Sequence, residues 1–540
     1  MNMSYLSRRA GLGSHGGHGL VRLTAIAAAT LIAVFAAPAS AAAEVSPRST
    51  LNYHIQIPAP ATHEIEVELT VPADVNGPFE LMMPIWSPGY YKVEDYAANV
   101  SDVRARTADG HAVAVEHTRY NRWRVASDGP VTVSYRVYGN QRSVTTNYVG
   151  ADYAVICGAP TFLTLVEPGG TRTHDIHYTL PAGWVAATGL SPIAGQTNGF
   201  RATSYDILVD SPLLAGPVGL RTFDVAGKRH TVATVGDAST WEADAATNDL
   251  HTFVDEVSRF WGFLPYDQYV FLFMFRPGGG GLEHLNSNLS TVLTSSRPGA
   301  PTDRGRWNSL GLAAHEYFHL FNAKRLRPVE LGPFDYEKPP TTGSLWLAEG
   351  VTSYYSDLLL ARAGLRTIDQ HLAAMSSLIA SLQTAPGRRL QSVEQSSLQV
   401  WNNSNSGVAP AATTVSYYTK GTIMGLLLDA RIRKATNGRR SLDDVMRLAY
   451  ERYAGESGYT AEQVRLTAEE VAGTSLQDWF RRSVSSTDEL DYAEMLDWFG
   501  LRFTTSTGRA GAWMLERRAD ATAVQKQHLA AWLAAEKGRS

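Results

Sequence analysis

The pentapeptide His315-Glu316-Tyr317-Phe318-His319 constrains the fold of this chain more than any other feature. On an α-helix, residues i and i+4 lie on one face about 6 Å apart, so His315 and His319 can direct ring nitrogens at a single metal ion. Glu316 projects from an adjoining face, where its carboxylate can take a proton from water held at that centre. The pattern therefore predicts a helix that carries a metal-dependent hydrolytic site.

The residues around this motif support the helix. Ser309 is a suitable N-cap, and the apolar run that follows it contains no proline and only Gly311 as an internal breaker. The alternative is a chance match to a five-residue pattern. Two histidines and a glutamate on an apolar helix would be costly without a partner, so the metal site is the better interpretation.

A third protein ligand is needed, because a catalytic zinc ion takes three and leaves the last position for water. Glu349 follows in a second expected helix, residues 345–363. Its apolar neighbours would make the carboxylate costly to bury unless a cation met it. The alternative is an exposed glutamate on an amphipathic helix. The sequence predicts one Zn²⁺ per chain, held by His315, His319 and Glu349.

The chain has 540 residues, of which 44% are hydrophobic, so it can bury several cores. Residues 51–220 alternate with period two and are rich in Val, Thr and Tyr, which predicts antiparallel sheets. A helical pattern at 239–260 then precedes a strand at 269–275, which predicts a mixed α/β domain around the motif. Helical patterns continue after it at 367–382, 417–433, 441–454, 461–471 and 476–486.

The first residues have the order of a secretory signal: three arginines, an apolar stretch from Leu23 to Ala37, then small residues. This predicts an exported protein, periplasmic in a bacterium or secreted, with an uncleaved anchor as the alternative. Cleavage would change the formal charge from −4 to −7 and leave no long apolar run. We expect neither nucleic-acid binding nor a stable membrane span. The single cysteine, Cys157, excludes an intramolecular disulfide.

Several segments together resemble one peptidase family. The motif continues as Asn-Ala-Lys-Arg-Leu-Arg-Pro at 322–328, Glu349 lies in Leu-Trp-Leu-Ala-Glu-Gly-Val-Thr at 345–352, and Trp-Ser-Pro-Gly-Tyr-Tyr occupies 86–91. With Gly-Gly-Leu-Glu-His at 280–284, this combination resembles the glycyl aminopeptidase family of zinc metallopeptidases. That family belongs to the gluzincins, which carry HExxH and a downstream Glu. We interpret residues 86–91 as a structural turn rather than a ligand site.

The resemblance implies two further functions. Glu283 would bind the free ammonium group of a substrate, while Gly280 and Gly281 would let the substrate backbone approach closely. Tyr418, in Tyr-Thr-Lys-Gly, would donate its hydroxyl to the oxyanion of the reaction. Tyr417 is adjacent, so the assignment of the phenol could be off by one residue. The alternatives are a glycine turn with a surface glutamate and a structural tyrosine.

The resemblance and the residue patterns together predict an α+β multidomain protein. The expected parts are a signal peptide at 1–43, an N-terminal antiparallel β domain at 44–228, a thermolysin-like mixed α/β catalytic domain at 229–365, a C-terminal all-α domain at 366–500 and a short tail at 501–540. Members of the family usually carry a PDZ domain. The tail has about half the length that such a fold needs, so we expect no complete PDZ domain here.

The expected function is a zinc aminopeptidase that removes small N-terminal residues from peptides, and the Gly or Ala preference is implied by the resemblance alone. Glu316 and Tyr418 are the expected catalytic residues. An endopeptidase with the same chemistry is one alternative. Another is an exported binding or assembly protein with a vestigial metal site, although such a protein should have lost at least one expected position and none is missing. The oligomeric state stays open.

Overall fold

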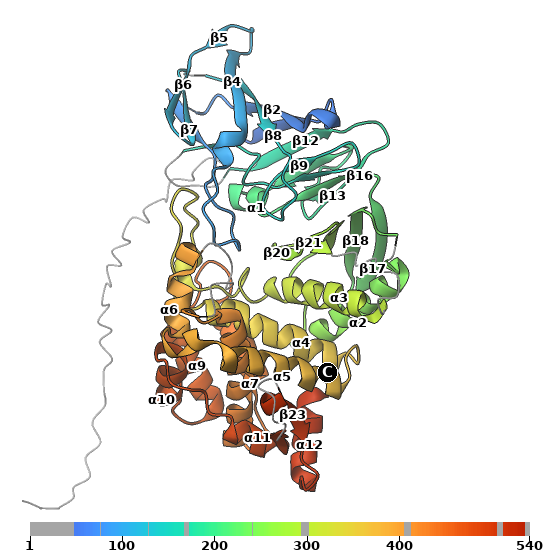
Figure 1. Ribbon diagram of the computed structural model, residues 1–540. Coiled ribbons are helices and arrows are strands. Elements are labelled where there is room, and N and C mark those ends of the chain that lie inside the picture. The colour runs from blue at the N-terminus through green and yellow to red at the C-terminus, as the bar shows by residue number, and fades with distance from the viewer. Residues whose placement is uncertain are drawn as a thin grey trace, which may run out of the picture. The chain divides into compact units, whose positions relative to one another are not determined.

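The computed structural model describes residues 48–75, 77–127, 129–166, 172–239, 241–292, 302–403, 412–504 and 511–534 (Figure 1). The expected signal peptide at 1–43 lies outside these residues. No helix in the described ranges is both long and apolar enough to cross a bilayer. Residues 48–540 form one compact unit, within which β-sheets come first, a mixed sheet follows and helices complete the chain.

The largest sheet of the N-terminal part has eight strands in the order β14-β15-β12-β1-β2-β8-β4-β5. They are β1 (Leu51–Gln56), β2 (Glu64–Val71), β4 (Val100–Thr107), β5 (Ala112–Val113), β8 (Val131–Tyr138), β12 (His174–Thr179), β14 (Ser191–Pro192) and β15 (Gly199–Ala202). Burial alternates along β2 and β8, as their period-two sequences predict. The expected antiparallel pairing holds except between β1 and β12, which are parallel.

Two four-stranded sheets complete this part. The first has the order β11-β3-β7-β6 and contains β3 (Phe79–Met82), β6 (Val115–Arg119), β7 (Arg122–Val125) and β11 (Thr164–Leu165). The second has the order β13-β16-β10-β9 and contains β9 (Tyr148–Val149), β10 (Ala154–Ile156), β13 (Val185–Thr188) and β16 (Leu213–Gly216). A short helix, α1 (Tyr205–Val209), precedes β16.

A mixed five-stranded sheet begins the second part, in the order β17-β18-β19-β21-β20. Its strands are β17 (Gly219–Val225), β18 (Lys228–Gly236), β19 (Gln268–Phe275), β20 (Gly280–Glu283) and β21 (Ser287–Val292). The pairs β18·β19 and β19·β21 are parallel, whereas β20 is an antiparallel edge strand. β17 falls within the range predicted for the β domain but pairs in this sheet, and the domain boundaries remain predictions.

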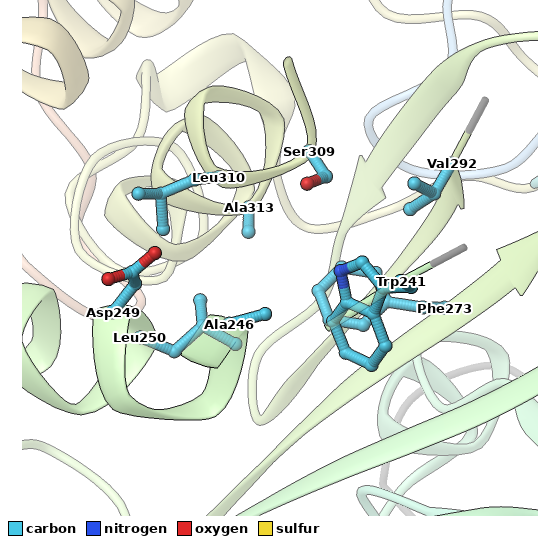
Figure 2. A pocket seen from close by; sticks show the side chains of 9 residues that line it. All are labelled: Trp241, Ala246, Asp249, Leu250, Phe273, Val292, Ser309, Leu310 and Ala313. Atoms are coloured by element: carbon cyan, nitrogen blue, oxygen red, sulfur yellow. The ribbon is translucent and has the colours of Figure 1, made fainter. Parts of the chain in front are cut away.

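Two helices pack on one face of the mixed sheet. They are α2 (Ala243–Trp261) and α3 (Thr302–His319), and α3 carries the HExxH motif. The helix begins at Thr302 rather than at Ser309, so the expected N-cap was wrong and Ser309 lies inside it. A small apolar pocket lies between α2, α3 and β19. Figure 2 shows Leu250, Leu310 and Phe273 around it.

The remaining chain is mostly helical. Beyond α3 come the turn η3 (Val329–Leu331), the π-helical turn η4 (Trp346–Val351), α4 (Thr352–Arg362), α5 (Ile368–Thr384), α6 (Val393–Leu398), α7 (Tyr417–Ala435), α8 (Leu442–Tyr453), α9 (Ala461–Ala472), α10 (Gln477–Phe480), η7 (Arg481–Ser485) and α11 (Ala493–Phe499). The tail forms a two-stranded sheet, β22 (Leu501–Phe503) with β23 (Leu515–Arg517), followed by α12 (Ala523–Leu533). Ser, Thr and Gln side chains cap α5, α6, α9 and α12 in capping boxes.

A separate hydrophobic cluster joins the N-terminal sheets to the mixed sheet. It combines Tyr148, Val155 and Leu214 of the N-terminal part with Leu272 of β19 and Leu289 of β21. The mixed sheet is therefore covered on both faces, by helices on one side and by the β domain on the other. The cluster also contains Cys157, whose thiol is buried and whose pKa burial raises to about 12. This agrees with an inert, structural cysteine.

Candidate metal centre

Two neighbouring helical segments bring the three predicted metal ligands together. His315 and His319 lie one turn apart at the end of α3, and Glu349 lies on η4, the π-helical turn that leads into α4. α3 packs against α4, so the carboxylate is presented to the face that carries both imidazoles. A π-turn shifts the direction of side chains relative to a regular α-helix, and such turns are frequent at functional sites.

The ligand atoms are close enough to share one cation. Nε2 of His319 lies 2.9 Å from Nε2 of His315 and 3.1 Å from Oε2 of Glu349. The third distance, from Nε2 of His315 to the same carboxylate oxygen, is 3.6 Å. Metal bonds of 2.0–2.1 Å at tetrahedral angles place ligand atoms about 3.3 Å apart. The three side chains therefore fit a divalent ion with tetrahedral preference.

Hydrogen bonds behind the ligands fix their orientation. Nδ1 of His319 lies 2.9 Å from the carbonyl oxygen of Asn322, which selects the tautomer that leaves Nε2 free for a metal. The Asn322 amide donates in turn to the carbonyl of Leu347 on η4 and to the hydroxyl of Thr352 on α4. Asn322 is fully buried. One side chain thus connects the end of α3 to the turn that carries Glu349.

Three buried carboxylates surround the same point. Glu283, Glu316 and Glu349 are 5%, 4% and 2% exposed. Burial raises the pKa of Glu316 well above its ordinary value, and the charges of Glu283 and Glu349 add to this shift. Burial opposes a charge on His319, but the carboxylates, led by Glu349, raise its pKa to about 10. Burial and the neighbouring carboxylates thus disfavour a charge on Glu316, and a cation at this point would favour the ionised form that a general base requires.

The predicted amine-binding glutamate lies at the end of the edge strand β20. Ligand atoms of Glu283, Glu316 and His319 all lie within 4.8 Å of one another, so this group shares His319 with the metal ligands. Gly281 packs against Glu316, because a β-carbon there would lie 2.2 Å from Glu316 Oε1. The structure therefore places Glu283 and Gly281 beside the candidate metal ligands.

The backbone around Glu283 is fixed from the β domain. Asp210, which ends α1, accepts hydrogen bonds from the backbone N–H of Leu285 at 2.7 Å and from Lys324 Nζ at 2.6 Å. His284 Nδ1 lies 3.1 Å from the same carboxylate. All of these groups are buried or nearly so. The motif Gly-Gly-Leu-Glu-His is thereby attached both to the β domain and to the chain that follows α3.

Tyr418 reaches the site from α7. Its ring centroid lies 6.1 Å from that of His315, and the side chain lines the same cavity as the ligands. Burial raises the pKa of Tyr418 well above its ordinary value, and the charge of Glu349 raises it further, so the phenol keeps its proton. The adjacent Tyr417 is almost fully buried and does not line this cavity. The geometry favours Tyr418 over Tyr417.

The cavity has a volume of about 260 Å³ and opens above the metal ligands. It is lined by Gly89, Tyr90, Arg142, Ser143, Val144, Arg276, Gly279, Gly280, Gly281, Glu283, His315, Glu316, His319, Glu349 and Tyr418. Every predicted site residue therefore contributes to one cavity. Its size suits a short stretch of peptide rather than a folded domain.

Sequence reasoning missed the residues that the β domain contributes. Gly89, in the segment interpreted as a structural turn, lies so close to Glu283 that a β-carbon would come within 2.6 Å of Oε1. Its φ of +89° also favours glycine. Tyr90 and Arg142 of the β domain line the cavity as well, as does Arg276 of the mixed sheet, which sequence reasoning also missed. Only the resemblance at 86–91 could have signalled Gly89, and no motif marks the arginines.

Comparison with models of known protein families shows to which family this chain belongs. A family model described as the Peptidase M61 N-terminal domain matches residues 52–217, and one described as M61 glycyl aminopeptidase matches residues 308–424. Together they span more than half of the chain. The chain belongs to the M61 glycyl aminopeptidase family. It is accordingly a metallopeptidase, and its peptide substrates follow from that membership.

Solved structures resemble this M61 chain over most of its length. An aminopeptidase N family protein from Idiomarina loihiensis aligns with a TM-score of 0.78 and 28% identity, over 84% of this chain and 78% of that one. A variant of an M1 zinc metallopeptidase from Deinococcus radiodurans, bound to a Tyr-Ser-Ala substrate, aligns with a TM-score of 0.50 and 15% identity, over 82% and 95%. The second likeness shows a shared fold only. No curated protein matches the chain.

Proposed function

We propose that this M61 member is a zinc aminopeptidase that hydrolyses small N-terminal residues, glycine or alanine, from peptides with a free N-terminus. The observation that carries the proposal is the position of Glu283. Its carboxylate shares one cavity with the His315, His319 and Glu349 cluster, so a bound ammonium group would place the first peptide bond of a substrate at the metal centre. The Gly or Ala preference rests on family membership.

The donor set of two imidazoles and one carboxylate suits zinc. Held by His315, His319 and Glu349, zinc would supply Lewis-acid polarisation of the scissile carbonyl and lower the pKa of water. Glu316 accepts the proton of the attacking water on its carboxylate and passes it to the leaving amine. Its position against Gly281 supports this function, because Gly281 lies on the strand that a substrate backbone would follow.

Two further side chains bind the substrate. Glu283 accepts hydrogen bonds from the ammonium group, which fixes the distance from the N-terminus to the bond that is cut. The Tyr418 hydroxyl donates a hydrogen bond to the developing oxyanion, and its raised pKa means that this donor keeps its proton at neutral pH. Gly280 and Gly281 leave the edge of β20 open to the substrate backbone.

The decisive experiment uses Glu316→Gln with amino-acyl amides as substrates. Turnover should fall by at least about 10³-fold, because no other positioned base replaces the carboxylate. Zinc content, measured by atomic emission, should stay near one per chain, since Glu316 is not a ligand. Retained rate together with lost zinc would overturn this assignment.

A second test separates an aminopeptidase from the endopeptidase alternative. Glycyl and alanyl amides are compared with their N-acetylated forms, each with and without a chelator. We expect acetylation to abolish hydrolysis, because it removes the positive charge that Glu283 binds. Equal cleavage of free and acetylated substrates would support the endopeptidase.

We also propose that the chain is exported to the periplasm or secreted, with residues 1–43 as the signal. The support is the sequence pattern of charged, apolar and small residues. Cell fractionation followed by mass spectrometry of the mature N-terminus tests it. A protein that keeps its first 43 residues in the cytoplasmic fraction would contradict the proposal.

A further inference from the structure

Two arginines line the cavity that holds the three glutamates. Arg142 lies in the loop between β8 and β9 of the β domain, and Arg276 directly follows β19 of the mixed sheet. Both side chains line this one cavity, together with Gly279 and Gly280. The cavity is thus lined from both parts of the fold, with Arg142 from the β domain and Arg276 from the mixed sheet.

Neither arginine is neutralised by a carboxylate within 4.0 Å in the described ranges. Arg142 stacks on the ring of Tyr148, 4.1 Å from its centroid, and donates to the hydroxyl of that tyrosine. Arg276 donates to the carbonyl of Pro277 at 2.9 Å and to Thr291 Oγ1 at 3.2 Å, and its buried Nε has no partner. These contacts hold both side chains in place. Asp152 accepts a hydrogen bond from the same Tyr148 hydroxyl at 3.1 Å and acts on the charge of Arg142 without pairing with it directly.

The register of β20 orders the charged groups along the edge of the sheet. Glu283 ends the strand, Gly281 contacts the general base Glu316, and Gly280 pairs with Thr291, whose hydroxyl binds Arg276. A substrate whose ammonium group lies at Glu283 and whose scissile bond lies beside Glu316 must therefore run along β20 toward Gly280. Its far end approaches the arginines.

The distance along the strand sets the length of peptide that would reach. Glu283 and Gly280 are three residues apart, which corresponds to about 10 Å at the rise of an extended strand. An extended tripeptide spans roughly this distance between its ammonium and carboxylate groups, and a dipeptide is one residue shorter. Longer peptides would carry their carboxylate out of the cavity.

We propose that Arg142 and Arg276 bind the free α-carboxylate of short peptides, so that the enzyme prefers substrates of two or three residues with both termini free. The inference rests on the proposed aminopeptidase function and adds a substrate class to it. The cavity then complements a zwitterion, with carboxylates at one end and guanidinium groups at the other. Arginine suits this function because its planar fork matches a carboxylate.

The test compares Ala-Ala-Ala with Ala-Ala-Ala-amide, and Ala₆ with its amide, by kcat/KM. The free tripeptide should be the better substrate by roughly tenfold or more, as expected for hydrogen bonds to a charged group, and the hexapeptide pair should differ little. Added NaCl should reduce the tripeptide preference, because Arg142 is exposed to solvent and its charge is screened by salt.

Variants then assign the effect to the arginines. Arg276→Gln and Arg142→Gln should each raise KM for the free tripeptide and leave the amide nearly unchanged. The matched control is Arg229→Gln, which changes an exposed arginine of β18 that pairs with Asp224 of β17, and it should keep the wild-type ratio.

The outcomes separate the two proposals. If neither the acid nor the amide is cleaved, the proposed function fails. If both are cleaved with equal kcat/KM by the wild-type enzyme, the function stands and the carboxylate site is refuted. This readout needs no variant, so it holds even if an arginine substitution impairs folding.

Discussion

Gly350 and Gly421 bring the segment that carries Glu349 into backbone contact with the helix that carries Tyr418. A β-carbon on Gly350 would lie 2.5 Å from the α-carbon of Gly421, and one on Gly421 would lie 2.5 Å from the carbonyl oxygen of Trp346. Real β-carbons do not approach other atoms so closely. The distance between the metal ligand and the phenol is therefore set by two glycines.

Substituting one of these glycines should impair both stability and activity. For Gly421→Ala we expect the free energy of unfolding to fall by about 1–3 kcal/mol, because the methyl group must push two backbones apart. Denaturant titration measures the loss, and kcat should fall with it. Gly311→Ala is the control, since a β-carbon there would be 3.5 Å from its nearest neighbour and alanine favours the helix.

A methyl group on Gly281 should disturb the general base directly. In Gly281→Ala the new carbon would lie 2.2 Å from Glu316 Oε1, so the carboxylate must turn away. We expect kcat to fall by at least about tenfold while zinc binding, measured by atomic emission, is unchanged. Gly129→Ala, at a loop position with open space around it, should behave as wild type. An unaffected kcat in Gly281→Ala would contradict the proposed function of Glu316.

The C-terminal helix α12 should contribute to stability through one side chain. Trp532 is fully buried, its indole donates to the hydroxyl of Tyr354 at 2.9 Å, and its carbonyl accepts from Arg362. Trp532→Ala should lower the free energy of unfolding by about 3–5 kcal/mol. Calorimetry tests this, with the exposed Val524 of the same helix, replaced by alanine, as the control. Equal melting temperatures would refute it.

Buried neutral histidines should make the protein less stable in acid. Burial lowers the pKa of His174 to about 4, and burial likewise lowers that of His230 to about 4. In the unfolded chain both histidines take up a proton near pH 6.5, whereas in the folded chain they do so only near pH 4. The contribution of these two histidines to the free energy of unfolding is therefore fully present above pH 6.5. It is lost as the pH falls toward 4, by up to about 1.4 kcal/mol for each histidine and each pH unit.

Urea titrations between pH 7.5 and 4.5 measure this slope. His174→Phe should make it shallower, because one of the titrating groups is removed. His177 on the same strand is exposed, so His177→Phe serves as the matched control. A wild-type stability that does not change over this range would contradict the expectation.

Local sequence patterns predicted the helices and strands well, because the formation of these elements depends mainly on residues that are close in the sequence. The five helical patterns expected after residue 366 correspond to α5, α7, α8, α9 and the pair α10 and η7. The grouping of His315 and His319 could be predicted for the same reason, since the i, i+4 spacing places them on one helix face, and their role as metal ligands stays a prediction. Boundaries were harder: α3 starts seven residues before the Ser309 cap, and the six-residue α6 gives too short a pattern to detect.

What could not be predicted depends on contacts between distant segments. Gly89 touches Glu283, and Arg142 and Arg276 line one cavity, only because the β domain packs on the mixed sheet. The hydrophobic periodicity of each segment by itself does not predict how the two segments pack together. The π-helical turn at Glu349 was equally hidden, because its sequence differs little from that of an ordinary helix.

The hydrophobic cluster between the N-terminal sheets and the mixed sheet has a consequence for protein engineering. It holds the loop of Arg142 and the turn of Gly89 beside a metal centre that is built entirely from the other half of the molecule. Chimaeras that exchange the first half between relatives would therefore alter which peptides are accepted without altering the chemistry. A truncated enzyme lacking that half would lose Gly89 and Arg142 from the cavity, whereas Glu283, Arg276 and the metal ligands belong to the half that remains.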